Sequence, residues 1–501
     1  METGKNLFNL LAGLIKLLNT FPSVDDPDEL LEEHEDKLEK EVQEYLTASG
    51  IFTYAAQFRL PSDVYEDIIN WCTENRNFYL IQIILCKLDM QLPNHIWVDS
   101  KKGHPFRCLN DNEDETGILI LPHVKGPQTI HKMADRQDPE TIIERVRVNA
   151  TKWDKPLNAR LRNFYFVEKE ELDGFDLENV IYEGILNERQ LRSLKIAVTP
   201  LCSKPIPEVL NYDDNVVEKD ASGNPRRFLD FIQVINPSEI EADFAKCYEV
   251  ACKNDVDILI APEMFGTTAM YGEDEMGYNH YFRQLGREFN GEGSLGLILA
   301  PSYWNKNQNK ANFYTRSGKK IGEQYKQHRY GFHGKHGPCK ENLKNIPKKI
   351  CLIHIPNWGR LAILICVDFL HAAYRQLIVS ALQADFLLCP SFSPGNGNFE
   401  KALPAQMEFD CYAIWINCCT ASRPNSRSPM PDYVGGICAP TVSSRSPIVR
   451  LTPTCQGTCR KGCLFVAELP LNCAGESIHE DAEIKCYHIW EGKEEENGPI
   501  R

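Results

Sequence analysis

The sequence predicts an α/β domain preceded by a mainly α-helical region. From Leu194 onward, short apolar runs alternate with segments of helical spacing, as strands and helices do in α/β domains. Residues 1 to about 190 show mostly helical spacing and few strand signals. With 501 residues the chain is also too long for one ordinary core. We therefore expect a helical region at 1–190, an α/β domain at 191–485 and a C-terminal tail at 486–501.

The N-terminal region begins with an amphipathic pattern over Leu7–Leu18, which predicts a helix that packs on protein, with an interfacial membrane helix as the alternative. An acidic run follows from Asp25 to Glu44, and its simplest interpretation is a solvated helix face. The remaining expected elements are a helix pair over Ser62–Leu88, a loop over Asp99–Thr116, a strand over Gly117–Leu121 and a helix over Pro139–Arg162.

Seven apolar runs are the expected strands of the second region. They are Lys195–Leu201, Val256–Ala261, Leu295–Ala300, Ile350–Ile355, Leu361–Val367, Phe386–Cys389 and Ala413–Asn417. The segments between Asp257 and Leu295, and between Asp368 and Ala384, are long enough for helices, which completes the α/β pattern.

Composition narrows the class of protein. The chain has 43% hydrophobic and 25% charged residues, which is typical of globular proteins and excludes disordered or collagen-like ones. Its net charge of −15 argues against a protein that coats nucleic acid or anionic lipid. Nineteen irregularly spaced cysteines favour reduced thiols and a cytoplasmic location over a secreted disulfide framework. No apolar run reaches the roughly 18 residues of a membrane span.

Three segments place reactive side chains at the ends of apolar runs, where a sheet can present them to a cleft. The run from Asp257 delivers Glu263 just after a proline, the segment Gly318–His328 carries Lys326 after a turn, and the run from Gly359 breaks off at Cys366. Any one of them alone has a simple structural explanation, since most cysteines are buried for packing.

Together the three segments resemble the nitrilase, or carbon–nitrogen hydrolase, superfamily, whose members carry a Glu-Lys-Cys triad in this chain order. The resemblance covers about residues 194 to 470 and includes the later runs Ala384–Ser391 and Trp415–Asn417. It implies an α-β-β-α sandwich that commonly dimerises, so a homo-oligomer is expected.

The resemblance also implies roles for single residues. Cys366 is the implied nucleophile, its pKa lowered by helix-terminal N–H groups, and Glu263 the general base. Lys326 and the backbone N–H of Val367 are the implied stabilisers of the oxyanion. Neither a metal nor a cofactor is required.

Other residues belong to the expected site less firmly. Glu341 is the one acid left between Lys326 and Cys366 and is a candidate for positioning substrate, and His328 and Asn417 are further candidates for substrate binding. Two positions depart from the family pattern. Val367 stands where an aromatic residue is usual, and Tyr325 lies one place later than the usual tyrosine.

The stretch 316–349 holds ten lysines and arginines against two glutamates. It is either a solvated loop, a recruiting site for an anionic substrate such as a nucleotide derivative, a contact for a nucleic-acid or protein partner, or a dock for the acidic run. The triplets Cys455/Cys459/Cys463 and His328/His333/His336 are interpreted as structural rather than metal-binding, because neither has the spacing of a metal site.

The expected function is therefore thiol-dependent hydrolysis of a non-peptide C–N bond in a small amide or nitrile, with an amidase favoured. The alternative is a nitrilase-like scaffold in a larger assembly, for example a bacterial defence system, whose turnover is dispensable. The helical region would then regulate, assemble or dock a partner.

Overall fold

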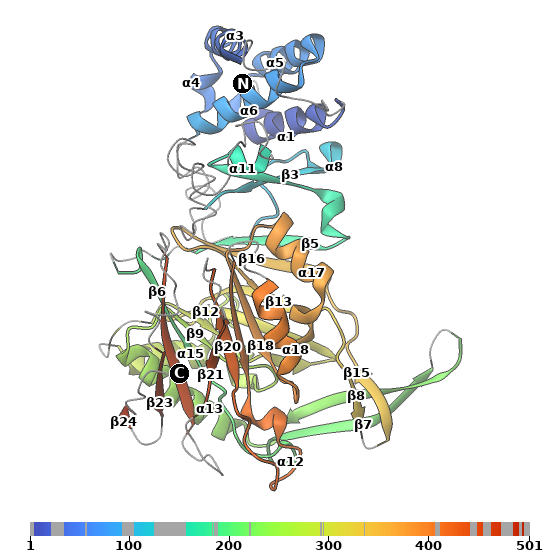
Figure 1. Cartoon of the computed structure of the whole chain (residues 1–501), viewed down its shortest axis with the longest axis vertical. Coiled ribbons are helices and arrows are strands. Elements are labelled where there is room, and N and C mark those ends of the chain that lie inside the picture. The colour runs from blue at the N-terminus through green and yellow to red at the C-terminus, as the bar shows by residue number, and fades with distance from the viewer. Residues whose placement is uncertain are drawn as a thin grey trace. The chain divides into compact units, whose positions relative to one another are not determined.

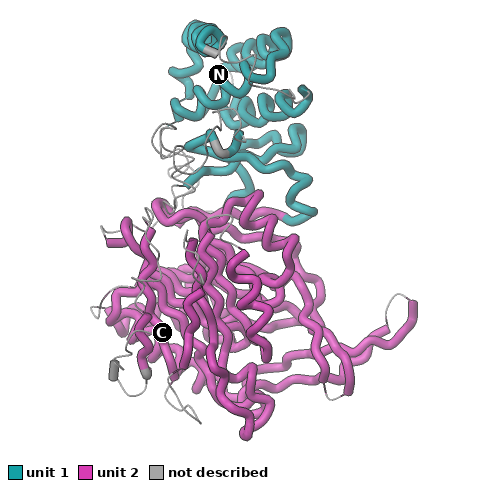
Figure 2. Tube along the Cα trace, in the orientation of Figure 1, with its two compact units in different colours: residues 1–125, 131–175 teal, residues 126–130, 176–501 magenta. Residues whose placement is uncertain are grey.

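The computed structural model describes residues 5–21, 35–55, 58–92, 105–124, 157–182, 184, 189–219, 222–290, 293, 295–334, 336–405, 411–440, 448–453, 462–471, 484–489 and 493–494. The chain divides into two compact units (Figure 2). Unit 1 comprises residues 1–125 and 131–175, and unit 2 comprises residues 126–130 and 176–501. Each unit has its own core and is described by itself.

Unit 1 is built around a buried N-terminal helix. Helix α1 spans Leu7–Leu18, and Asn6 caps it by accepting a hydrogen bond from the amide of Phe8. Its apolar side chains are buried, so the packing interpretation is confirmed and the apolar stripe lies within the unit. The other helices are α3 (Glu35–Ala48), α4 (Ile51–Ala55), α5 (Ser62–Asn75), α6 (Phe78–Gln91), α8 (Glu113–Thr116) and α11 (Leu157–Arg160). None of the helices described in the chain is long and apolar enough to cross a membrane.

Two small antiparallel pairs complete unit 1. They are β1 (Lys5–Asn6) with β2 (Arg59–Leu60) and β3 (Ile118–Pro122) with β4 (Phe164–Glu168). The expected helix pair corresponds to α5 and α6 and the expected strand to β3, whereas β4 was not predicted. Residues 25–34 of the acidic run and residues 139–156 of the expected helix lie outside the described residues, and the second half of the run, residues 35–44, belongs to α3.

Unit 2 contains two large mixed sheets, and all seven expected strands are present in them. The nine-stranded sheet has the order β11-β12-β10-β9-β6-β22-β23-β24, with β13 paired to β12. Its strands are β6 (Ser193–Val198), β9 (Ile258–Ile260), β10 (Leu297–Leu299), β11 (Tyr303–Asn305), β12 (Gln308–Thr315), β13 (Lys320–Tyr325), β22 (Cys463–Pro470), β23 (Ile484–His488) and β24 (Lys493–Glu494).

The seven-stranded sheet has the order β21-β20-β19-β18-β17-β16-β5. Its strands are β5 (Asp176–Ile181), β16 (Lys349–Ile355), β17 (Gly359–Ile363), β18 (Phe386–Ser391), β19 (Tyr412–Asn417), β20 (Gly435–Cys438) and β21 (Ile448–Leu451). Strand β5 lies before residue 190, yet it pairs in parallel with β16 along its whole length, so this sheet draws on sequence that we expected to be part of the helical region.

Helices lie outside the sheets, which gives an α/β architecture (Figure 1). Helices α13 (Pro237–Lys253) and α15 (His280–Glu288) pack on the nine-stranded sheet, where Phe244 and Phe282 enter a shared core. The shorter helices are α12 (Ile206–Val209), α14 (Thr268–Tyr271), α16 (Val367–Leu370), α17 (Ala372–Gln376) and α18 (Gly397–Ala402). The two sheets meet where β13 faces β16, because the Gln324 side chain bonds the backbone of Cys351 and Lys349.

A third sheet was not predicted. Its order is β14-β15-β8-β7, formed by β7 (Leu210–Lys219), β8 (Pro225–Val234), β14 (Gly331–Gly334) and β15 (Gly337–Glu341). Strands β7 and β8 form a long ribbon that projects from the body of unit 2 (Figure 1). Strand β15 pairs in parallel with β8, and Glu341 lies opposite Leu229. One of the candidate site residues is thus held by this sheet.

Candidate active site

Cys366 lies on a tight turn between a strand and a helix. Strand β17 ends at Ile363, and Cys366 is the residue that precedes the first turn of α16. Its φ of 53° and ψ of −112° are unusual for a residue with a side chain, and such backbone strain occurs most often at functional sites. The amide of Cys366 is fixed by the carbonyl of Pro390 at 2.9 Å. The turn therefore holds the sulfur in one orientation at the end of the sheet.

Lys326 follows the last residue of β13 and is completely buried. Its backbone amide donates to the carbonyl of Asn309 at 2.8 Å. Its Nζ donates to Glu263 Oε1 at 2.8 Å and to Glu341 Oε1 at 2.7 Å. Burial lowers the pKa of the ammonium group, but the two carboxylates outweigh burial and hold it well above its ordinary value. Lys326 is therefore a fixed positive charge.

Glu263 lies three residues after β9 ends, and donors surround both of its oxygens. Besides Lys326, Oε1 accepts from Asn309 Nδ2 at 2.8 Å, and Oε2 accepts from the backbone amide of Phe392 at 2.8 Å. The following residue, Met264, has a φ of 79°. The chain thus turns sharply after Glu263. Three donors from three different segments fix its carboxylate in place.

Glu341 completes the buried ion cluster. Its Oε2 accepts the backbone amide of Tyr330 at 2.8 Å, while its own amide donates to the Tyr330 carbonyl at 3.0 Å. Burial raises the pKa of Glu341 to about 7, against the lowering effect of the nearby Lys326 ammonium. The structure thus brings the weakly supported candidate Glu341 into direct contact with Lys326.

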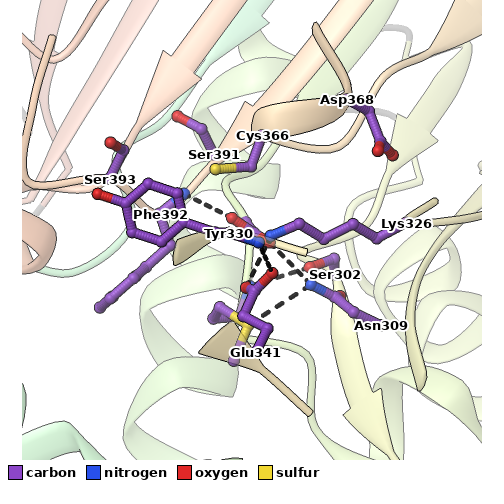
Figure 3. Close-up of polar contacts among 12 residues, drawn as sticks. Ser302, Asn309, Lys326, Tyr330, Glu341, Cys366, Asp368, Ser391, Phe392 and Ser393 are labelled. Carbon is purple, nitrogen blue, oxygen red and sulfur yellow. Dashed lines mark hydrogen bonds and ion pairs between the residues drawn. The ribbon is translucent and has the colours of Figure 1, made fainter. Parts of the chain in front are cut away.

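The sulfur of Cys366 faces this cluster (Figure 3). Burial raises the pKa of the thiol well above its ordinary value, the charge of Glu263 raises it further, and Lys326 opposes both. This direction is opposite to the lowering that we expected from helix-terminal N–H groups. The thiol is therefore neutral at rest, and forming a thiolate requires a base.

Three other predicted residues lie around this cluster. Val367 is the first residue of α16, so its amide belongs to the helix terminus next to the sulfur. The ring of His328 pairs with Asp368 at 2.8 Å and stacks on His371 at 3.9 Å between ring centroids. The side chain of Asn417 accepts the amide of Ser393 and donates to its carbonyl, so it holds the loop after β18 rather than touching the ion cluster through these bonds.

Sequence reasoning missed four residues of this site. Asn309 orients Glu263, Phe392 supplies a backbone donor, and Tyr330 holds Glu341. Asp368 accepts hydrogen bonds from the amides of Gln327 and His328, directly after the lysine. No pattern marked Asn309, because it stands among polar residues at the start of β12, a strand that was not expected. For the others the contact depends on distant segments.

The basic stretch 316–349 is distributed over strands β13 to β16. Carboxylates pair with four of its ammonium groups, Lys320 with Glu323, Lys326 with Glu263 and Glu341, Lys344 with Glu218, and Lys349 with Glu178. Arg316 is bound by the carbonyls of Phe289 and Gly293. Much of the positive charge of the stretch 316–349 is thus engaged by contacts within unit 2.

Within the described residues, no group of three or more His, Cys, Asp or Glu side chains is placed to hold a metal ion. Cys463 is buried in β22, and Cys455 and Cys459 lie outside those residues.

Of the family models, curated proteins and solved structures compared with this chain, only solved structures are similar to it. No protein-family model matches the sequence, and no curated protein does. Among solved structures, the chain is similar to an amidase from Nesterenkonia sp., with 15% identity and a TM-score of 0.36 over 58% of this chain and 94% of that one. It is also similar to Saccharomyces cerevisiae Nit3, of the nitrilase superfamily, with 15% identity and a TM-score of 0.35 over 58% of this chain and 93% of that one.

The architecture of unit 2 agrees with the resemblance noted in the sequence. Two mixed sheets carry helices on their outer faces, and the strand ends bring the three resembling segments together. Unit 2 therefore has an α/β architecture built on two mixed sheets.

Proposed function

We propose that unit 2 is a thiol-dependent hydrolase of non-peptide C–N bonds, and specifically an amidase. The observation that carries the proposal is the buried cluster in which Lys326 joins Glu263 and Glu341 beside Cys366. Burying three ionisable groups costs free energy, and such clusters with perturbed pKa values are found most often at functional sites. A neutral thiol with a carboxylate base beside it fits nucleophilic catalysis.

The residues divide the reaction between them. Glu263 takes the proton of the Cys366 thiol while the sulfur attacks the amide carbon, so that an S–C bond forms and the C=O becomes an oxyanion. The ammonium of Lys326 and the amide of Val367 stabilise that oxyanion. Glu263 then gives its proton to the departing nitrogen, the C–N bond breaks and an amine or ammonia leaves. Glu263 next activates a water that hydrolyses the thioester to a carboxylic acid.

Glu341 favours an amide over a nitrile as the substrate. An unsubstituted amide carries two N–H donors, whereas a nitrile nitrogen carries none. A second carboxylate beside the catalytic lysine can accept one of those donors and orient the leaving nitrogen. A nitrile nitrogen offers no such donor, so Glu341 would keep only its bonds to Lys326 and to the Tyr330 amide and would not orient the substrate.

The test is ammonia release from a panel of small primary amides, with the matching nitriles as the comparison. We expect release from amides, and its loss by at least about a thousandfold in Cys366→Ala. Cys86→Ser in unit 1 is the matched control, because Cys86 is the described cysteine that is not fully buried. Equal release by both variants would contradict the proposal and favour the scaffold alternative.

A labelling experiment separates the chemistry from substrate choice. An electrophilic amide analogue that binds before it reacts should modify Cys366 in preference to the other cysteines, as read by peptide mass spectrometry. Indiscriminate modification, led by Cys86, would argue against an activated nucleophile at position 366.

A further inference from the structure

The sulfur of Cys366 lies under an almost complete cover of side chains. Only 1% of Cys366 is exposed, and Lys326 and Glu263 are buried to the same degree. Of the residues labelled in Figure 3, only Tyr330 and Phe392 are partly exposed. Among these neighbours of the sulfur, the cover therefore reaches the surface at two aromatic rings.

Phe392 is tied to both the general base and the core. Its amide donates to Glu263 Oε2 at 2.8 Å. Its ring centroid lies 6.1 Å from that of the fully buried Phe265 and 6.3 Å from that of Phe231. Displacing this ring would disturb close packing as well as the hydrogen bond that orients the base. We therefore expect substrate to reach the sulfur along the other ring, Tyr330.

Tyr330 is anchored to the ion cluster by its backbone. Its amide donates to Glu341 Oε2 at 2.8 Å, and its carbonyl accepts the amide of Glu341 at 3.0 Å. The ring lies beside the sulfur of Cys366, and the hydroxyl is directed toward Ser393 (Figure 3). In agreement with this position, burial raises the pKa of the Tyr330 phenol, and the nearby charge of an ionised Cys366 raises it further.

The ring of Tyr330 also has a stacking partner. It lies parallel to the ring of Phe332 in β14, with 6.1 Å between centroids and 5° between planes. A half-exposed ring gains free energy when an apolar chain covers it. If an unsubstituted amide binds with its nitrogen at Glu341, the acyl chain is the group that remains to lie against Tyr330. An anchored ring in that place restricts the length of the chain.

We propose that Tyr330 selects the substrate by size, because its ring lies against the acyl chain of the amide that Cys366 attacks and admits short chains only. The inference rests on the proposed function and narrows the acyl group. Tyr330→Ala removes the ring and should admit longer chains. Tyr330→Phe keeps the ring and loses only the hydroxyl near Ser393, so it separates the size of the ring from the chemistry of the phenol.

Access to the sulfur is measured first, without turnover. Wild type and both variants are treated with iodoacetamide and with the bulkier N-cyclohexylmaleimide, and peptide mass spectrometry gives the rate at Cys366. In Tyr330→Ala we expect the rate with the maleimide, relative to that with iodoacetamide, to rise by about tenfold or more. Tyr330→Phe should keep the wild-type ratio. Cys351, buried in β16, is the internal control for unfolding and should stay unmodified.

Turnover is measured second. The ratio of kcat/KM for hexanamide to that for propionamide should rise by about tenfold or more in Tyr330→Ala and stay unchanged in Tyr330→Phe. Tyr487→Ala is the matched control, at a partly buried tyrosine of β23 whose hydroxyl donates to Asn254 at 2.7 Å.

The outcomes distinguish this inference from the proposed function. Unchanged alkylation and an unchanged ratio in Tyr330→Ala, as in Tyr487→Ala, would overturn size selection even if amides are hydrolysed. Equal effects of Tyr330→Phe and Tyr330→Ala would also overturn it, because the hydroxyl rather than the ring would then be responsible. A selective rise in Cys366 alkylation with no hydrolysis of any amide would support the place of Tyr330 over the sulfur and refute the proposed function.

Discussion

The ammonium of Lys326 lies 2.7 Å from Glu341, and both side chains are buried in unit 2. The same ammonium binds Glu263, so one cation is shared by two carboxylates. A buried cluster with more negative than positive groups holds a proton readily, because burial disfavours its net charge. The protonation of this cluster is therefore expected to govern activity near neutral pH.

The first prediction concerns the pH dependence of activity. Burial raises the pKa of Glu341 to about 7, so its carboxylate is mostly protonated below that pH and ionised above it. If the ionised form orients the amide nitrogen, kcat/KM rises with pH through an inflection near 7. In Glu341→Gln that inflection should disappear and kcat/KM should fall by about a hundredfold. An unchanged inflection in Glu341→Gln, measured from pH 5 to 9, would assign it to another group.

The second prediction separates the two effects of Glu263 on Cys366. Burial is the largest cause of the raised pKa of the Cys366 thiol, and the negative charge of Glu263 raises this pKa further. Glu263→Gln removes both the charge and the base. Ammonia release should therefore fall by about a thousandfold, whereas the pH midpoint for alkylation of Cys366 by iodoacetamide should move downward. If ammonia release and alkylation of Cys366 were both lost, the substitution would have disrupted the turn rather than the chemistry.

How far the sequence predicts this structure depends on where each contact comes from. The seven apolar runs are buried strands because their sequences favour burial, and Glu263 and Cys366 come shortly after two of them. Lys326 follows β13, which is not one of these runs, and was singled out through the resemblance of the three segments. The ribbon strand β7, in contrast, is rich in polar residues and its register shifts at two places, so no apolar run marks it. Strand β15, which pairs with β8 of the same sheet, places Glu341, which explains why that residue was only a weak candidate.

A second buried carboxylate near this strand has a structural partner that no sequence pattern indicates. Asp257 begins the run that leads to Glu263 and has the position of a strand-end carboxylate. It is fully buried and binds Arg189 at 2.6 Å and the amide of Lys195 at 2.7 Å. The partner Arg189 is 68 residues away in sequence, and no periodicity in the sequence specifies such a pairing. Asp257 thus anchors the strand rather than serving the site.

The third prediction treats Asp368 as a positioning residue. This buried carboxylate accepts the amides of Gln327 at 2.9 Å and His328 at 2.7 Å, and so fixes the chain just after Lys326. In Asp368→Asn one acceptor becomes a donor, and the lysine is held less well. We expect kcat to fall by about 10- to 100-fold with little change in KM.

Asp274→Asn is the control for Asp368→Asn. Asp274 is an exposed carboxylate that likewise accepts two backbone amides, those of Met276 at 3.0 Å and Tyr278 at 2.8 Å. Loss of an amide-binding carboxylate is common to both variants, so only the effect on Lys326 differs. Equal kinetics in the two variants, or a loss that appears in KM alone, would rule out a positioning role for Asp368.

The last prediction concerns the stability of unit 1, where Asp89 at the end of α6 is buried. Its carboxylate accepts the amides of Arg162 at 2.6 Å, Asn163 at 2.8 Å and Phe164 at 3.3 Å, and so ties α6 to the start of β4. Burial raises the pKa of Asp89 from 3.8 to about 6, although these amides lower it. The folded state therefore holds this proton more tightly than the unfolded state does.

From that difference the sign of the pH effect follows. Between about pH 4 and 6 the folded unit binds more protons than the unfolded chain, so the stability of unit 1 from this group falls as pH rises. The expected loss is about 2–3 kcal/mol, from roughly two pKa units at 1.36 kcal/mol each. Hydrogen exchange of the α6 amides should show it, and Asp89→Asn should abolish the slope. The exposed Asp67→Asn in α5 should leave it intact, and a slope that persists in Asp89→Asn would show that another group in unit 1 titrates instead.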